Sequence, residues 1–341
     1  MGEADLEAVP EAQRALARAA LAGAFGRAPD GPLVPVLGGA SGALAYRVEV
    51  GGRAYLLRLE PPRNALRNPH HYACLRAAAE AGVAPRVHWV DAEQGAAVMD
   101  FVAQRPLQGH PGGAAGLAGA MGALLRRLQG SPPFPAFGGG HLELIARMLD
   151  AVHRSALFAP GLLEPHREGF ARIRAAYAWH ESALVSSHND PNPRNVLFDG
   201  ERLWLVDWET AYRNDPLTDV AIATLELAGT PELRDALVRA WLGRAADRAL
   251  LARLELMRAL ARLYYAGTIL ARFAAAPLRA APDADLKALS PAELGAAVAS
   301  GRLAVGSPEM MYALGKLVLA QFLDDLRAPG FEESLAIARA G

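Results

Sequence analysis

The segment SHNDPNPRNVLF, residues 187–198, decides the fold together with LWLVDWE, residues 203–209, which follows it closely. The apolar runs in and around these segments predict three short strands separated by a polar loop and a turn. The loop carries an acid, Asp190, and an amide, Asn195, and the last strand ends on a second acid, Asp207. Two acids and an amide in this arrangement suit phosphoryl transfer that uses a divalent metal.

Each member of this trio has a role that suits its side chain. Mg²⁺ prefers a few hard oxygen ligands, so Asn195 and Asp207 are predicted to bind it. Asp190 is then predicted to be the catalytic base, which positions an acceptor hydroxyl and takes its proton late. The alternative is that Asp190 and Asn195 only form turns beside prolines, and the DWE on the following strand argues against it. His188 is either a general base or, as we favour, a residue that holds the loop.

The chain before this segment has the alternating pattern of a small antiparallel sheet. Residues 43–50 and 53–59 predict a hairpin closed by a Gly-Gly turn. A helix is predicted over 69–81, and a second hairpin follows over 86–102. These elements predict an N-terminal lobe made of a small antiparallel sheet and one main helix.

The remaining sequence is mostly helical. Apolar spacing predicts helices from about residue 103 to 182 and again after Leu217. We therefore predict an α+β protein with two lobes, the first over 1–105 with an N-terminal helix, and the second over 106–341. The second lobe would carry the catalytic loop and the acceptor site.

The composition excludes several classes of protein. The 341 residues are 52% hydrophobic and 21% charged, which excludes a disordered or collagen-like chain. The 35 basic residues nearly cancel the 36 acidic ones, so nucleic acid is not an expected partner. The single cysteine, Cys74, is expected to be a buried thiol, and the absence of a secretory signal or a bilayer-spanning segment predicts a cytoplasmic protein.

The motifs together resemble the aminoglycoside phosphotransferase and choline kinase superfamily, which is related to the protein kinases. The resemblance rests on SHNDPNPRNVLF, VDWE and the downstream NDPLTDVA, and covers roughly residues 34–228. It implies a protein-kinase-like fold with Mg²⁺-ATP between two lobes. It also implies that Asp190 is the base, that Asn195 and Asp207 bind the metal, that His188 organises the loop, and that Asp219 braces it from behind.

The resemblance also assigns nucleotide-binding residues in the first lobe. The GGASG segment is similar to a phosphate-covering glycine loop, Arg58 takes the place of the phosphate-binding lysine, and the strand over 95–102 is similar to the hinge that contacts adenine. The residues assigned in this way are Gly39, Ser41, Gly42, Arg58, Asp100 and Val102.

One departure from the family concerns the partner of Arg58. Where the family usually has a glutamate on the helix, this chain has His70, His71 and Tyr72, and Glu80 lies near the far end. Either His71 substitutes by hydrogen bonding, or Arg58 is held differently, or the histidines are simply exposed.

The acceptor is predicted from acidic residues and from the HND motif. Asn189 in HND, Glu209 in DWE and Glu226, seven residues after Asp219, resemble choline kinases, so Glu209 and Glu226 are predicted to attract a cationic acceptor such as choline or ethanolamine. Aromatic faces for a quaternary ammonium could come from helical residues: Trp241, Tyr264, Tyr265 and Phe273.

Several alternatives stay open at this stage. The acceptor could be an aminoglycoside or another antibiotic, which is also polycationic, or thiamine or another amino alcohol. The chain could also be a nucleotide-binding pseudokinase or a helical interaction protein without activity. The sequence does not decide between ATP and GTP, and it does not indicate the oligomeric state.

Overall fold

The computed structural model describes residues 6–37, 42–61, 68–275 and 281–340. The chain forms two compact units, which are considered separately. The first contains residues 1–135, 185–213 and 226–243, and the second contains residues 136–184, 214–225 and 244–341. The lobe boundary at residue 105 stays a prediction. Gly39 and Ser41, predicted to cover the phosphates, lie outside the described residues.

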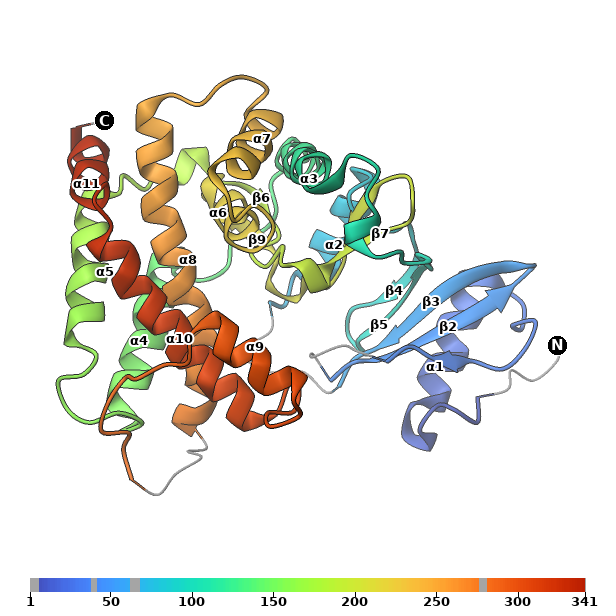
Figure 1. Ribbon diagram of the computed structural model, residues 1–341. Coiled ribbons are helices and arrows are strands. Elements are labelled where there is room, and N and C mark those ends of the chain that lie inside the picture. Colours follow the sequence, from blue (N-terminus) through green and yellow to red (C-terminus); the bar gives the residue numbers. More distant parts are fainter. Residues whose placement is uncertain (1–5, 38–41, 62–67, 276–280, 341) are drawn as a thin grey trace. The chain divides into compact units, whose positions relative to one another are not determined.

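The first unit begins with a five-stranded antiparallel sheet in the order β1-β2-β3-β5-β4 (Figure 1). The central hairpin pairs Tyr46 with Leu57, and its turn uses Gly51 and Gly52, whose φ angles are 63° and 71°. Two consecutive residues with positive φ are what a two-residue hairpin turn requires, so the predicted hairpin is confirmed. The strands are β1 (Val34–Pro35), β2 (Leu44–Val50), β3 (Arg53–Leu59), β4 (Val87–Asp91) and β5 (Ala96–Asp100).

One face of this sheet packs in the hydrophobic core, and the other carries polar side chains. Leu57 and Leu59 of β3 are fully buried in a core that helix α1 (Glu11–Phe25) covers with Ala20 and Leu21. Because side chains alternate along a strand, Arg58 lies on the opposite face of β3. The buried leucines therefore hold the strand in register, and the other face is available for a polar site.

Helix α2 (His71–Glu80) and the predicted second hairpin complete this part of the unit. The helix starts later than predicted because the Asn68 side-chain oxygen accepts a hydrogen bond from the His70 amide at 2.9 Å. It stops where predicted, before Gly82, whose φ of 68° is left-handed.

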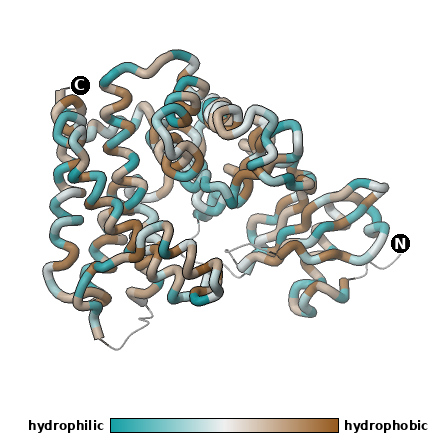
Figure 2. Tube along the Cα trace, viewed as in Figure 1, coloured by the Kyte–Doolittle hydropathy of each residue, from teal (hydrophilic) through white to brown (hydrophobic). Residues whose placement is uncertain are grey.

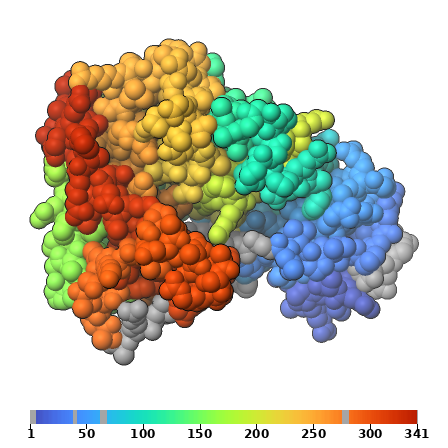
Figure 3. Space-filling model, in the orientation of Figure 1, coloured from blue at the N-terminus to red at the C-terminus, as the bar shows by residue number. Residues whose placement is uncertain are grey.

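Helices α3 (Gly113–Gln129) and α7 (Pro231–Leu242) lie side by side in the same unit (Figure 3). A side chain on Gly122 would lie 2.2 Å from the Leu237 carbonyl oxygen, so the two backbones approach closely. The Trp241 indole donates to the Gln129 side chain at 2.8 Å. Between them in sequence come the short strands β6 (Val185–Ser187), β7 (Val196–Phe198), β8 (Leu203–Leu205) and β9 (Tyr212–Asn214), which form the pairs β6-β9 and β7-β8.

The second unit is helical and is organised around α8 (Arg248–Ala275), which packs against α4, α10 and α11. Hydrophobic and hydrophilic stretches alternate along these helices, as expected for amphipathic helices that share a core (Figure 2). The predicted α+β class, with a small antiparallel sheet followed by mostly helical structure, is confirmed. The other helices here are α4 (Gly140–Arg154), α5 (Glu164–Ala176), α6 (Leu217–Glu226), α9 (Pro291–Ala299), α10 (Pro308–Arg327) and α11 (Phe331–Ala340). Among the described helices, none combines the length and apolar character that crossing a membrane requires.

Candidate active site

The loop that follows β6 is held by neutral, buried hydrogen bonds. His188 is fully buried, and its Nε2–H donates to the Val206 carbonyl at 2.9 Å. Its ring also packs on Trp208, with 4.6 Å between the ring centroids. Burial lowers the pKa of His188 to about 4, so the ring is neutral near pH 7. His188 therefore joins the loop to the strand that leads into Asp207, and its role as a loop organiser stays a prediction.

Asn189 has a backbone conformation that few residues adopt. Its φ is 64°, and its buried Nδ2 donates to the carbonyls of Thr210 at 2.9 Å and Tyr212 at 3.3 Å. Asparagine and glycine are the residues that most easily adopt positive φ, so the choice between HND and HGD follows a backbone requirement. The Asn189 amide thus faces the protein interior, and its use as a sign of a choline-like acceptor stays a prediction.

Asp190 is oriented by two side-chain amides. Asn192 Nδ2 donates to its Oδ1 at 2.7 Å, and Asn195 Nδ2 donates to its Oδ2 at 3.1 Å. The Asn192 amide is itself fixed, because its Oδ1 accepts from the Arg194 backbone N–H at 2.9 Å. Asn192 was not predicted as a site residue, although its position two residues after the acid could have indicated it. The two amides that orient the carboxylate carry no charge.

Asn195 and Asp207 are brought together through the backbone. The Val206 N–H donates to the Asn195 carbonyl at 3.0 Å, and Asp207 follows directly with a left-handed φ of 66°. Because Asn195 Nδ2 is bonded to Asp190, the amide oxygen is the atom that suits a cation. The described residues contain no cluster of three or more His, Cys, Asp or Glu that could hold a metal. A carboxylate and an amide oxygen nevertheless fit Mg²⁺, which takes its other ligands from water and phosphate.

Arg58 is surrounded by three carboxylates. Its Nη2 pairs with Asp207 at 3.2 Å and with Glu209, and its Nε lies 3.5 Å from Glu60 Oε1. Burial acts to lower the pKa of Arg58, but Asp207, Glu209 and Glu60 outweigh it and raise the pKa above its ordinary value. The guanidinium is therefore firmly charged. Glu209, predicted to attract the acceptor, is paired with Arg58 in this structure, and its acceptor role stays a prediction.

His71, one of the two histidines at the start of α2, contacts Glu60. His71 Nε2 lies 3.2 Å from both Glu60 carboxylate oxygens, and His71 Nδ1 lies 2.7 Å from the Asn68 carbonyl oxygen. His71 is buried and His70 is exposed, so the interpretation that both are simply exposed is wrong for His71. Glu60 was not predicted because it lies directly after strand β3 rather than on the helix.

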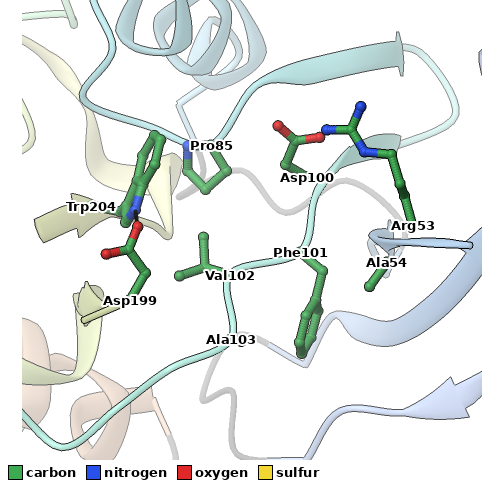
Figure 4. Close-up of a pocket in the computed structure, with 9 residues that line it drawn as sticks. All are labelled: Arg53, Ala54, Pro85, Asp100, Phe101, Val102, Ala103, Asp199 and Trp204. Carbon is green, nitrogen blue, oxygen red and sulfur yellow. Dashed lines mark hydrogen bonds between the residues drawn. The ribbon is translucent and has the colours of Figure 1, made fainter. Parts of the chain in front are cut away.

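The hinge residues line a cavity of about 340 Å³ at the end of β5 (Figure 4). Within the described part of the chain, the Val102 backbone makes no hydrogen bond. A residue that contacts adenine through its backbone needs such an N–H or carbonyl group. Asp100 differs, because its N–H donates to the Arg86 carbonyl and its carboxylate accepts from His88 at 2.7 Å. Trp204 and Asp199 lie on the other side of Val102 and are joined by a 2.7 Å hydrogen bond. Val102 is thus better suited than Asp100 to contact a base through its backbone.

Comparison with known proteins agrees with this arrangement. The model of the Phosphotransferase enzyme family matches residues 33–256. This chain belongs to that family. The predicted enzyme class, a small-molecule phosphotransferase, is therefore confirmed, and the resemblance to choline kinases is also found among solved structures.

Three individual relatives of this phosphotransferase are informative. Protein LicA of Haemophilus influenzae is 38% identical over 61 residues, which are 18% of this chain and only 23% of that protein. A choline/ethanolamine kinase family protein from Mesorhizobium loti has 26% identity and a TM-score of 0.70, over 96% of this chain and 99% of that one. The choline kinase LicA from Streptococcus pneumoniae has 12% identity and a TM-score of 0.59, over 93% and 99% of the two chains, and so shows the shared fold alone. The predicted protein-kinase-like fold is confirmed.

The remaining predicted residues of the phosphotransferase lie on or near α6. Asp219 is fully buried in its first turn, and Glu226 is exposed at its last residue. Asp215, which was not predicted, caps this helix: its Oδ1 accepts from the Leu217 N–H at 2.8 Å and its Oδ2 pairs with Arg253 at 3.1 Å. The bracing role of Asp219 and the acceptor role of Glu226 stay predictions. Gly42, the described member of the glycine loop, has a φ of 73°.

Proposed function

We propose that this phosphotransferase uses Mg²⁺ and ATP to phosphorylate a hydroxyl of a small cationic molecule such as choline or ethanolamine. The observation that carries the proposal is the Asp190 carboxylate, held on both oxygens by the amides of Asn192 and Asn195. A base that is aimed by two fixed donors is pre-organised for one acceptor position, and it lies beside a residue pair that fits Mg²⁺.

The residues of the chain divide the chemistry between them. Asn195 and Asp207 would hold Mg²⁺ through an amide oxygen and a carboxylate, and a bound Mg²⁺ neutralises charge on phosphate oxygens. Asp190 orients the acceptor hydroxyl and accepts its proton. Arg58 offers its Nη groups to phosphate oxygens, since a guanidinium fork matches such oxygens well.

The cationic acceptor is supported by the relatives and by acidic residues. The relative from Mesorhizobium loti is a choline/ethanolamine kinase family protein. Glu209 is paired with Arg58 and Glu226 is exposed, and both stay the predicted acidic residues for the acceptor. Of the aromatic candidates, Trp241, Tyr264 and Phe273 are buried at 9%, 5% and 8% exposure, so they pack in the core, and only Tyr265 is half-buried.

The competing interpretations are separated by activity. An antibiotic phosphotransferase shares the same base and metal pair, so only the acceptor distinguishes it. The pseudokinase alternative rests on the absent helix glutamate and on Arg58, and Glu60 beside Arg58 supplies a carboxylate that the helix lacks. A helical interaction protein would leave the orientation of Asp190 without a use.

The test is Mg²⁺-dependent ADP release from ATP with choline, ethanolamine, thiamine and several aminoglycosides. Asp190→Asn should lower kcat about 10²- to 10⁴-fold, the usual contribution of a general base, without changing the melting temperature. Asp235→Asn, an exposed aspartate on α7, is the matched control and should turn over normally. Turnover of an aminoglycoside but not of choline would replace the proposed acceptor, and full activity in Asp190→Asn would overturn the assignment of the base.

A further inference from the structure

Glu60 occupies a position that a carboxylate does not hold without compensation. Its side chain is only 4% exposed, compared with 32% for Asp207 and 20% for Glu209. A buried carboxylate must be paired with cations or hydrogen-bond donors, and Glu60 has Arg58 on one side and His71 on the other. Of the three carboxylates around Arg58, Glu60 is therefore the one whose side chain is least able to move away from the guanidinium.

The backbone also fixes Glu60. Its N–H donates to the Gly95 carbonyl at 2.8 Å, just beyond the end of β3. A side chain on Gly95, whose φ is 75°, would approach Glu60 Cβ to 3.2 Å, so the site is closely packed. Arg58 is the penultimate residue of β3, and Glu60, two residues later, directly follows the strand. The short separation along the chain and the hydrogen bond to Gly95 together keep the carboxylate beside the guanidinium.

The contacts divide the guanidinium into two ends. Glu60 approaches Nε, and Asp207 and Glu209 approach Nη2. An arginine can be held through Nε while its Nη groups bind other anions, which a lysine with one ammonium cannot do in the same way. On the far side of Glu60, His71 bridges its carboxylate and the Asn68 carbonyl, so that α2 supports Glu60 rather than Arg58 directly.

We propose that Glu60 is the positioning carboxylate of Arg58, holding the guanidinium through Nε so that its Nη groups face the nucleotide phosphates, with His71 fixing Glu60 from α2. The counter-charge of the phosphate-binding cation then comes from the residue that follows its own strand instead of from the helix. This inference rests on the proposed function, because it assigns the phosphate contact to Arg58.

The experiment compares nucleotide binding in Glu60→Gln, Glu60→Asp and His71→Gln by calorimetry with MgADP and, separately, with adenosine. Glu60→Gln keeps the shape and removes the charge, so the Kd for MgADP should rise about tenfold, the loss expected for one charge-assisted hydrogen bond. The Kd for adenosine, which has no phosphate, should stay within twofold. Glu60→Asp and His71→Gln should give smaller losses, and KM for ATP should change more than kcat. Glu80→Gln is the matched control, because Glu80 is an exposed glutamate on α2, the helix that carries His71.

The outcomes separate this inference from the function on which it rests. If Glu60→Gln binds MgADP as tightly as the unaltered chain, or weakens adenosine as much as MgADP, Glu60 has only a structural role and the inference is overturned. If the unaltered chain binds no MgADP, the proposed function falls and the inference with it. Selective loss of the phosphate contribution supports the inference, even if Glu60→Gln also lowers the melting temperature.

Discussion

The cluster around Arg58 and the loop over residues 187–195 are neighbouring parts of one site built on opposite physical principles. The cluster joins one guanidinium to three carboxylates, and two of these are partly exposed. The loop contains Asp190 as its acid, and this side chain is aimed by neutral amides, while neutral His188 is buried behind it. Charged partners can be exchanged for other ions without leaving a bare charge, whereas buried amides hold one geometry. The comparison teaches that one set of residues balances the charge of Arg58, whereas another set orients the Asp190 carboxylate.

The largest effect that would sharpen this comparison comes from Asp207, which pairs with Arg58 in the cluster and is the proposed metal ligand together with Asn195 of the loop. Asp207→Asn keeps a residue that tolerates positive φ but removes the charge needed for the metal. We expect kcat to fall about 10²- to 10³-fold, the usual loss when one electrostatic contact to the transition state is removed. Steady-state kinetics at several Mg²⁺ concentrations measures it.

Glu209→Gln is the control for that experiment, because it removes another carboxylate from the same guanidinium. We expect kcat to fall tenfold or less if Glu209 only balances charge, on the order of one charge-assisted hydrogen bond. Equal losses in both variants would show that the cluster acts as a single unit and would break the distinction drawn for Asp207.

A smaller effect is expected in the pH dependence of the free energy of unfolding, to which the neutral His188 of the loop contributes. Burial lowers the pKa of His188 to about 4, and the same cause lowers the pKa of His141 and His166 to about 4. The unfolded chain takes up these protons near pH 6.5, before the folded chain does. The free energy of unfolding should therefore fall as the pH drops from about 6.5 to 4, by about 1.4 kcal/mol per pH unit for each histidine. Urea unfolding at intervals across this range measures the slope.

His188→Gln should reduce that slope by the share of one proton, because it retains a donor for the Val206 carbonyl without titrating. His180→Gln, at an exposed position in the second unit, is the matched control. An unchanged slope in His188→Gln would mean that His188 is charged in the folded loop, contrary to its neutral role.

The smallest effect concerns the backbone of Asn189. Asn189→Gly and Asn189→Ala both remove the buried amide, but only alanine is strained at a φ of 64°. We expect the alanine variant to be less stable than the glycine variant by about 1 to 2 kcal/mol. Denaturant titration of both proteins gives the difference. A more stable alanine variant would contradict the explanation of HND and HGD as a backbone requirement.

The elements that were predicted well depend on short stretches of chain. The hairpin over β2 and β3 follows from local alternation and a Gly-Gly turn, and α2 ends before Gly82 because that residue adopts positive φ. The proposed base and the proposed metal ligands were assigned because Asp190, Asn195 and Asp207 stand in a short, ordered motif, and these roles stay predictions. Their proximity follows from two adjoining short strands.

The features that the sequence did not reveal are contacts between distant parts of the chain. The pairing of Glu209 with Arg58, across 151 residues of sequence, was not predicted. Glu60 was overlooked because its importance depends on burial by α2 and on the position of His71. Spacing along the chain contains no information about which carboxylate is desolvated.

The sequence by itself determined the residue types and the local backbone: the acid, amide and acid of the phosphotransferase motif, the strands that present them, and the asparagine or glycine required at positive φ. Only the tertiary structure decided which partners these residues have. It brought Glu60, Glu209 and Asp207 to one guanidinium, with Glu60 excluded from water and the other two partly exposed. The reason is that charge interactions depend on distance and burial in three dimensions, whereas strand and turn preferences depend on adjacent residues.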